Sequence, residues 1–217
     1  MLKKRVVTFC SSKGFTLVEL IVSISIMLVV MTITLSGRPD AILRLAVTDA
    51  TSKTELLIRQ VQLRGSSVNS AGNTYGGAGV FFNRATSTRV LSFKDRIDET
   101  VVSTLGVGNG LYDSSLINEA NETISLDRGN KFGKLCVSMS TSTFFCNDAN
   151  DPDISNLTIS FNRPTQRANI YINNATTTNY SAACIQIDSV KSPENGYVKS
   201  VYVYRSGMIT RSTSECN

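Results

Sequence analysis

The sequence contains no histidine. Histidine is the commonest general base, a member of the usual Ser/His and Cys/His nucleophile pairs, and the commonest zinc ligand. Its absence excludes the most frequent catalytic and zinc-binding arrangements. We therefore expect a protein that is not an enzyme and that has no obligatory cofactor.

The chain also lacks a strong excess of one charge once its first 14 residues are set aside. It has 22 basic and 17 acidic residues, but four of the basic ones precede Phe15. These four are Lys3, Lys4, Arg5 and Lys13. The remaining 18 basic residues are nearly balanced by the 17 acidic ones. A nearly neutral product has no overall electrostatic attraction to DNA, acidic lipid or acidic substrates, so we expect no nucleic-acid partner.

Cysteines are few, and all except Cys10 follow the longest apolar run of the chain. An even number in an oxidising compartment predicts disulfides, here with three possible pairings, and free buried thiols are the alternative. Cys136 and Cys146 flank a short predicted hairpin, which favours a local disulfide between them. Cys184 would then tie Cys216, near the end of the chain, to the sheet, although sequence alone gives no geometry for either pair.

Residues 15–35 form an apolar run of 21 residues with one charge, Glu19. As a helix rising about 1.5 Å per residue, the run would span roughly 32 Å, which matches a hydrocarbon core of about 30 Å. The basic residues before it favour a cytoplasmic N-terminus, so we expect a single-pass membrane protein whose head lies outside.

Two bland explanations of the apolar run stay open. A secretory signal peptide also begins with a basic stretch and an apolar core, but its cleavage site follows that core. Residues 36–39, Ser-Gly-Arg-Pro, give no clean small-x-small site. An uncleaved signal anchor is therefore the stronger alternative.

A second helix is expected in residues 36–70. Gly37 and Pro39 should interrupt or kink the first helix, because glycine is entropically unfavourable there and proline lacks a donor and clashes with the preceding turn. From residue 41 to about 64, apolar residues recur at near-helical spacing and charged residues fall on other faces. The apolar positions are Ile42, Leu45, Ala46, Ala50, Leu57, Val61 and Leu63. Residues 69–79 are rich in Gly, Ser and Asn, so the helix ends before them.

Residues 71–217 are predicted to form a β-rich head. Short runs of β-branched and aromatic residues are separated by Gly, Asn and Ser without intervening helices, which favours antiparallel sheets. The predicted strands are 80–83, 89–93, 123–126, 134–139, 143–146, 157–162, 168–172, 184–188, 198–204 and 208–211. Ser206-Gly207 is typical of a hairpin turn between the last two. The expected fold class is α+β, with a long N-terminal helical spine on an antiparallel β-sheet head.

The stretch Lys13-Gly14-Phe15-Thr16-Leu17-Val18-Glu19 runs directly into the apolar helix. With the basic leader before it, this stretch resembles the type IV pilin and type II secretion pseudopilin superfamily, whose prepilins share a K-G-F-T-L-x-E junction. The resemblance is specific over residues 13–35 and only topological beyond them. It implies a structural subunit with a pilin-like fold, made as a precursor whose leader peptide, residues 1–14, is removed.

By that resemblance, a membrane-embedded prepilin peptidase cuts after Gly14 and methylates the new amine of Phe15. Membrane lipid surrounds the helix before assembly. Afterwards the helix packs with other pilin or pseudopilin subunits in an extracytoplasmic filament, built at an inner-membrane assembly platform. The resemblance thus supplies the partners and the localisation.

Glu19 has a separate physical argument. A carboxylate drawn into a dry bundle of helices is costly unless it is paired. The free amine of Phe15 on a neighbouring subunit is an available cation, so we expect the pair to set the axial register between subunits. The alternative is that Glu19 lies at the headgroup boundary.

The remainder of the chain refines the family placement. Residues 79–82, Gly-Val-Phe-Phe, and the terminal hairpin at residues 201–211 look like those of H-type minor pseudopilins and FimT-like minor pilins. The 14-residue leader is longer than usual, and the break at Gly37 and Pro39 falls later than the proline of many major pilins. A minor, initiating or tip role is favoured.

Four side chains near residues 106–123 could supply oxygen ligands for calcium, as in some pseudopilin heads. They are Asn109, Asp113, Glu119 and Glu122. Their spacing does not match the twelve-residue calcium loop, so a solvated polar loop is favoured and no metal is expected.

Arg205 and Arg211 suggest comparison with FimT-like pilins that bind DNA during natural transformation. Residues 207–211 echo the basic C-terminal motif of those proteins only loosely, and Glu215 lies close by. Arginines can contact phosphates, but at strand edges they are more often solvated charges that discourage aggregation. A DNA-binding minor pilin and a signal-anchored surface adhesin or enzyme are the alternatives to a structural filament subunit.

Overall fold

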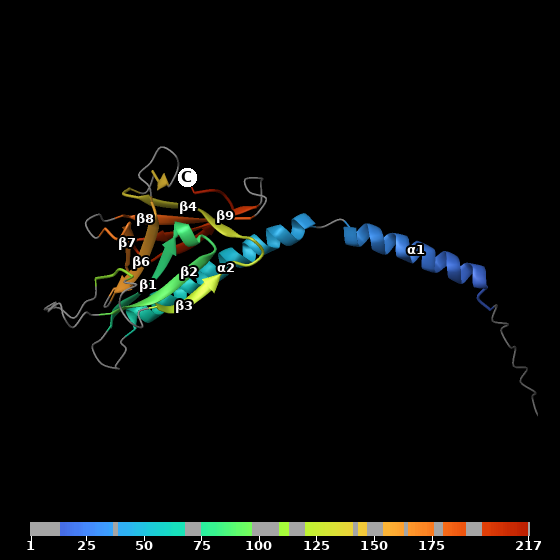
Figure 1. Ribbon diagram of the computed structural model, residues 1–217, viewed down its shortest axis with the longest axis horizontal. Helices are drawn as coiled ribbons and strands as arrows, with labels where there is room; N and C mark the ends of the chain where they lie inside the picture. The colour runs from blue at the N-terminus through green and yellow to red at the C-terminus, as the bar shows by residue number, and fades with distance from the viewer. Residues whose placement is uncertain are drawn as a thin grey trace, which may run out of the picture. The chain divides into compact units, whose positions relative to one another are not determined.

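The computed structural model describes residues 14–36, 39–67, 75–96, 109–112, 120–140, 143–146, 154–162, 165–175, 180–189 and 197–216. Within these ranges two helices precede ten strands (Figure 1). The chain divides into two compact units, residues 1–40 and 41–217. The expected α+β class is confirmed, since the apolar helix is followed by a second helix and by antiparallel sheets.

Helix α1, Leu17–Ser36, is apolar on all sides, and its large side chains are exposed. Its 18 residues Leu17–Thr34 are long and apolar enough to cross a membrane, by length and composition. Its hydroxyl groups bond to the helix itself: Ser23 donates to the Glu19 carbonyl at 2.7 Å, and Thr34 to the Val30 carbonyl at 3.0 Å. These polar groups are therefore satisfied without water, as a lipid environment requires.

Helix α2, Pro39–Ser66, begins with the proline that was expected to break the helical run. Proline suits the first position of a helix, because the N–H it lacks would have no intrahelical partner there. Helix α1 ends at Ser36. Gly37, the other predicted breaker, lies outside the described residues.

The predicted apolar face of α2 is wrong at three positions. Ile42, Leu45 and Leu63 are exposed, whereas four of the seven predicted residues are buried, namely Ala46, Ala50, Leu57 and Val61. The buried face also includes Val47 and Ile58, together with Thr51 and Thr54. Both threonine hydroxyls donate to carbonyls four residues earlier in the helix. Because these hydroxyls are paired inside the helix, threonine can share the buried face with apolar residues, which a count of apolar residues alone misses.

The ten strands form two five-stranded antiparallel sheets. Sheet A has the order β3-β2-β1-β6-β7 and sheet B the order β10-β9-β8-β4-β5. The strands are β1 Tyr75–Asn83, β2 Arg89–Arg96, β3 Ala120–Ser125, β4 Lys131–Ser138, β5 Phe145–Cys146, β6 Asn156–Asn162, β7 Ala168–Ile172, β8 Ala182–Asp188, β9 Val198–Tyr204 and β10 Ile209–Ser212. Each overlaps one predicted strand, and Gly207, at φ 90°, lies in the turn between β9 and β10.

Strand β1 begins five residues before its predicted start, inside the glycine-rich stretch. Gly79 pairs with Phe93 on β2, whose ring occupies the space that a side chain at Gly79 would need. The glycines are therefore part of the strand because they leave room for large neighbours, a packing role that composition does not reveal.

One hydrophobic core joins α2 to both sheets. It includes Val47 and Leu57 from α2, Phe82 from sheet A, and Ile185 and Val201 from sheet B, all essentially inaccessible to solvent. The head therefore depends on α2 as its central element, and truncation within α2 would remove part of the core.

The closest approach of α2 to sheet A is at Gly65. A β-carbon added there would overlap the carbonyl oxygen and β-carbon of Phe161 on β6. Gly65→Ala should improve helix propensity by roughly 1 kcal/mol. Overpacking of this kind typically costs about 1 to 3 kcal/mol, so we expect a net loss of stability. Urea unfolding of the detergent-solubilised chain measures it, with exposed Gln60→Ala as the control, and an increase in stability for Gly65→Ala would contradict the contact.

Candidate functional site: the N-terminal junction and its helix

The predicted cleavage junction precedes α1 and is exposed. Phe15 is 68% accessible, and a β-carbon added to Gly14 would meet no atom within 4 Å. Gly14, Phe15 and Thr16 have no regular secondary structure. A protease can bind such an extended, open segment without unfolding a helix or strand.

Helix α1 starts immediately after the junction because Thr16 caps it. The Glu19 backbone N–H donates to the Thr16 hydroxyl at 3.2 Å, and the Leu20 N–H donates to the Thr16 carbonyl at 3.1 Å. Thr-x-x-Glu is the spacing of a capping box, and an acidic side chain in the first turn interacts favourably with the helix dipole. The sequence analysis did not identify this cap, although Thr16 and Glu19 carried its signal.

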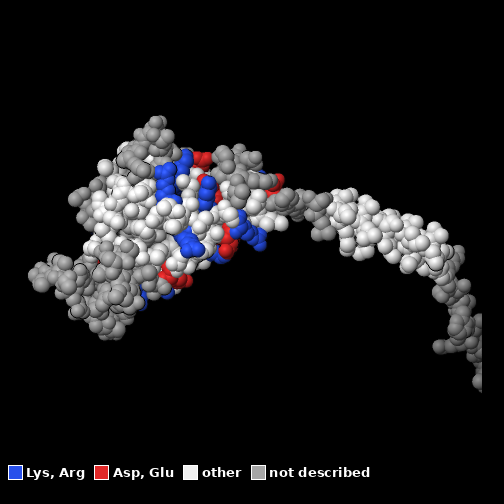
Figure 2. All heavy atoms as spheres, viewed as in Figure 1, with Lys and Arg blue, Asp and Glu red and all other residues white. Residues whose placement is uncertain are grey.

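Glu19 is the one charged residue in α1. The face of α1 visible in Figure 2 shows no charged side chain, whereas basic and acidic side chains lie close together on the head. Large apolar side chains of α1 such as Ile21, Met27 and Ile33 are 54–67% exposed. The helix thus combines an apolar surface without partners in the described residues with a single carboxylate in its first turn.

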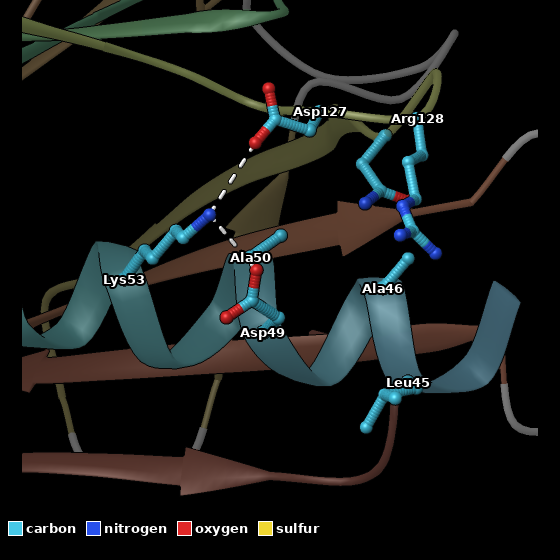
Figure 3. Close-up of a pocket in the computed structure, with 8 residues that line it drawn as sticks. Leu45, Ala46, Asp49, Ala50, Lys53, Asp127 and Arg128 are labelled. Carbon is cyan, nitrogen blue, oxygen red and sulfur yellow. Dashed lines mark hydrogen bonds and ion pairs between the residues drawn. The ribbon is translucent and has the colours of Figure 1, made fainter. Parts of the chain in front are cut away.

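A hollow of about 400 Å³ lies between α2 and the turn that joins β3 to β4. Figure 3 shows the Lys53 side chain extending towards the space between Asp49 and Asp127, with its ammonium group 2.9 Å from the first carboxylate and 3.4 Å from the second. Hydrogen bonds to Asp49 and Asp127 raise the pKa of Lys53. The acidic side chains of this hollow already pair with a cation of the same chain.

The proposed calcium ligands are only partly described. Asp113 and Glu119 lie outside the described residues. The Asn109 side-chain oxygen accepts from the Leu111 N–H at 2.8 Å, and Glu122 is exposed on β3. Within the part of the chain that the structure describes, no group of three or more His, Cys, Asp or Glu side chains is placed to hold a metal ion.

The structure places the two C-terminal arginines differently. Arg211 on β10 reaches α2, where its Nε lies 2.7 Å from Glu55 and its Nη1 donates to the Ser52 hydroxyl at 2.9 Å. Arg205 is exposed in the turn after β9. Burial and the charge of Asp95 raise the pKa of Tyr171, and Arg205 lowers it. Arg211 therefore serves as a link between sheet and helix.

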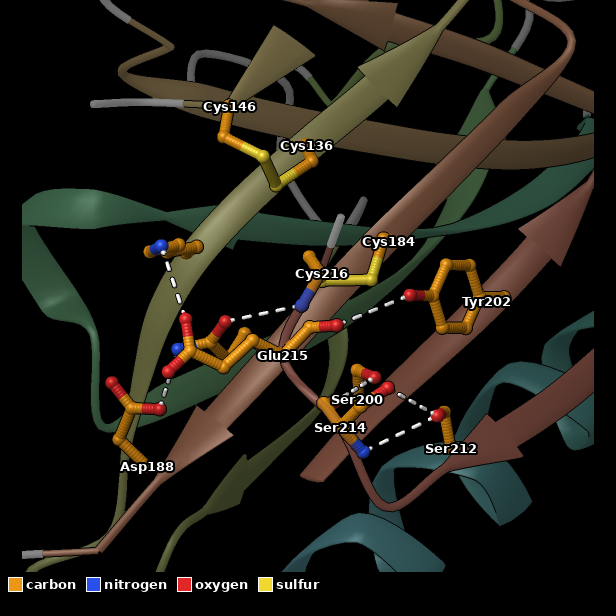
Figure 4. Close-up of a disulfide and its surroundings, with 12 residues drawn as sticks. Cys136, Cys146, Cys184, Asp188, Ser200, Tyr202, Ser212, Ser214, Glu215 and Cys216 are labelled. Atoms are coloured by element: carbon orange, nitrogen blue, oxygen red, sulfur yellow. Dashed lines mark hydrogen bonds and ion pairs between the residues drawn. A yellow bond between two sulfur atoms is a disulfide. The ribbon is translucent and has the colours of Figure 1, made fainter. Parts of the chain in front are cut away.

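The four downstream cysteines form two disulfides, Cys136–Cys146 and Cys184–Cys216 (Figure 4). They are the two pairs named in the sequence analysis. All four side chains belong to one buried cluster, against which Phe144 and Tyr202 pack. Disulfides persist in oxidising compartments, which agrees with a head outside the cytoplasm.

The C-terminal tail, residues 213–216, is fastened to sheet B beside these disulfides (Figure 4). Ser200 donates to the Ser214 carbonyl at 2.7 Å, and the Cys216 N–H donates to the Gln186 side-chain oxygen at 3.2 Å. Lys134 on β4 lies 3.3 Å from the Glu215 carboxylate. Apart from the disulfide, these few polar contacts hold the tail.

Next to the tail, Asp188 on β8 is buried and accepts a 2.8 Å hydrogen bond from the Gln186 amide. Burial raises the pKa of Asp188, and the nearby Glu215 carboxylate raises it further, while the Gln186 hydrogen bond and Lys131 and Lys134 lower it. A carboxyl whose pKa is higher in the folded state binds protons preferentially there. Its ionisation therefore destabilises the fold as the pH rises above its ordinary value, 3.8.

Asp188→Asn should consequently raise the free energy of unfolding at pH 7, because the amide keeps an oxygen for Gln186 but carries no charge. The gain should shrink as the pH falls below 3.8, where the native carboxyl is protonated in both states. Thermal melts of both proteins across this pH range measure it. Asp127→Asn, at an exposed ion pair, is the control and should change stability little. A loss of stability at pH 7 would show that the Asp188 charge is needed.

Comparison with protein families matches residues 10–35 to the prokaryotic N-terminal methylation motif. Searches of the curated proteins and of the solved structures gave no match. The matched residues span the junction at Gly14 and Phe15 and nearly the whole of α1. This motif, the apolar helix that follows and the antiparallel head together identify the chain as a type IV pilin-like prepilin.

Proposed function

We propose that this prepilin is a non-enzymatic structural subunit of a type IV pilus or a type II secretion-type filament. Prepilin peptidase cuts it between Gly14 and Phe15, methylates Phe15, and releases α1 for assembly. The observation that carries the proposal is the open junction capped directly into a helix that is apolar along its whole length.

An exposed helix of this kind needs a non-aqueous surrounding. Burying apolar surface is worth roughly 25 cal/mol per Å², so α1 is unstable in water and stable in lipid or among other helices. Between lipid and a bundle, however, the hydrophobic effect does not discriminate. Close packing and the Glu19 carboxylate must therefore supply the preference for the filament, with the Phe15 amine of a neighbouring subunit as the counter-charge.

The orientation follows from the same features. The basic leader keeps the N-terminus cytoplasmic, and the two disulfides suit a head in an oxidising compartment. Within the superfamily, we favour a minor subunit of the H or FimT-like type. This rests on residues 79–82, which lie in β1, and on residues 201–211, which make most of the β9–β10 hairpin.

The experiment is mass spectrometry of the N-terminal fragment from native membranes or sheared filaments. Cyanogen bromide cleaves after methionine, so the processed protein yields residues 15–27 with a methylated amine at Phe15. Cells without prepilin peptidase are the control and should yield residues 2–27. If wild-type filaments or membranes also yield residues 2–27 alone, the proposal is wrong and the chain is a signal-anchored surface protein.

A further inference from the structure

Three of the four disulfide-forming cysteines lie in one row across sheet B. Cys146 on β5 is directly opposite Cys136 on β4, and Cys136 is directly opposite Cys184 on β8. We call Cys146, Cys136 and Cys184 the cysteine row. Residues directly opposite in antiparallel strands point to the same face of the sheet. The middle cysteine, Cys136, therefore has a cysteine neighbour on each side.

Both neighbours are within reach of Cys136. Opposite residues in antiparallel strands have Cα atoms about 4.5 to 5.5 Å apart, and disulfides form at Cα separations of about 4.4 to 6.8 Å. Cys136 can bond only one of the two at a time. In the oxidised protein Cys184 is bonded to Cys216 of the C-terminal tail, which leaves Cys146 for Cys136. The tail thus selects the pairing of the row.

We propose that the cysteine row is a redox relay controlled by the C-terminal tail. Reduction of Cys184–Cys216 by a dithiol reductant is passed on to Cys136–Cys146. One two-electron reduction then leaves a single Cys136–Cys184 disulfide and releases both the tail and β5. This proposal does not depend on the filament role.

The electrons and atoms balance as follows. A thiolate of the dithiol attacks the Cys216 sulfur and expels the Cys184 thiolate. The second thiol of the reductant displaces Cys216 as a free thiol, so the reductant leaves as a disulfide. Cys184 then attacks the Cys136 sulfur, a new Cys136–Cys184 bond forms, and Cys146 departs as a thiolate that takes up a proton.

The order of the row suits the second step. Thiol–disulfide exchange proceeds through attack on one sulfur while the other sulfur leaves. Cys184 approaches Cys136 from the side of the sheet opposite to Cys146, because β4 lies between β5 and β8. The attacking and leaving sulfurs are thus on opposite sides of the central sulfur, as a displacement requires.

The tail is also the natural point of entry. Its backbone is outside the strand ladder, and Thr213 and Ser214 are exposed, so it can lift without breaking sheet hydrogen bonds. Cys136 and Cys184, by contrast, are fully buried within strands. Departure of the tail would uncover polar groups that it now contacts, among them Gln186 and Ser200, and the relay thereby changes the surface of sheet B.

The test uses the full-length protein in detergent, treated with substoichiometric dithiothreitol and then with an alkylating reagent. Trypsin leaves Cys136 and Cys146 together in residues 135–167, Cys184 in residues 168–191 and Cys216 in residues 212–217. Before reduction, the only link between these peptides joins 168–191 to 212–217. The relay predicts its loss and the appearance of a link between 135–167 and 168–191, with alkylated Cys146 and Cys216. Reduction of either disulfide without the new link overturns the proposal.

A matched pair of variants tests the geometry of the row. Cys146→Ser with Cys216→Ser leaves Cys136 and Cys184, which are opposite each other, and should oxidise in air to one disulfide. Cys136→Ser with Cys216→Ser leaves Cys146 and Cys184, which are separated by β4, and should keep two free thiols. Equal behaviour of the two variants overturns the proposal. Should a variant not fold, as judged by circular dichroism, the wild-type experiment decides alone.

Discussion

Glu19→Gln should leave cleavage and methylation at Phe15 intact and remove the subunit from filaments. The substitution keeps the size and hydrogen-bonding capacity of the side chain and removes its charge. If the carboxylate pairs with the Phe15 amine of a neighbour, the variant leaves that amine buried without a counter-charge. Losing one partner of a buried pair costs about 3 to 5 kcal/mol, and at about 1.4 kcal/mol per tenfold this is a loss of two to three orders of magnitude.

The measurement compares the variant and the wild type in sheared filaments and in membranes by quantitative immunoblot, with residues 15–27 checked by mass spectrometry. Membrane insertion gives no competing explanation, because removing a charge makes insertion of α1 easier. Ser25→Ala is the matched control, since the Ser25 hydroxyl donates to the Ile21 carbonyl of its own helix at 2.8 Å. Wild-type amounts of the Glu19→Gln protein in filaments would instead place Glu19 at the headgroup boundary.

The elements that the sequence predicted well are those whose signals are local. Helix α1 follows from an uninterrupted apolar run, and its start and end agree with the prediction to within two residues. The strands are short runs of β-branched and aromatic residues between turn-forming residues. Their type and number could be inferred because each run carries its own pattern.

The face of α2 was harder, because burial there depends on what packs against the helix. Ile42, Leu45 and Leu63 are apolar but exposed, while Thr51 and Thr54 are polar but buried. Nothing in the helical period distinguishes these cases. Only the position of the two sheets around α2 decides which residues enter the core, and that position is set by contacts distant in sequence.

The functional junction was predictable for the opposite reason. Residues 13–19 are contiguous, and each performs its role through local chemistry: a small residue before the bond, a cap at Thr16, and a charge in the first helical turn. The disulfide pairing was not fixed in the same way. Cys136 has two cysteine neighbours in the sheet, and which of them it bonds depends on where the tail brings Cys216.

The two disulfides should differ in their contribution to stability, because a disulfide that closes a longer loop removes more entropy from the unfolded chain. Cys184 and Cys216 are 32 residues apart, and Cys136 and Cys146 are 10 apart. The chain-entropy relation gives about 3.7 kcal/mol for the first and about 2.7 kcal/mol for the second. A domain of this kind has a total stability of about 5 to 15 kcal/mol, so either loss is large.

Cys184→Ser with Cys216→Ser should therefore lower the free energy of unfolding by about 3.7 kcal/mol, and Cys136→Ser with Cys146→Ser by about 2.7 kcal/mol. Each double variant keeps the other disulfide and has no thiol left in the four positions, so exchange within the row cannot confuse the comparison. Denaturant unfolding in detergent under oxidising conditions measures both. Wild-type protein with both disulfides reduced should lose about the sum of the two values. If the 10-residue loop proves the more stabilising, then contacts around Phe144 and Tyr202, rather than loop entropy, govern the stability of this cluster.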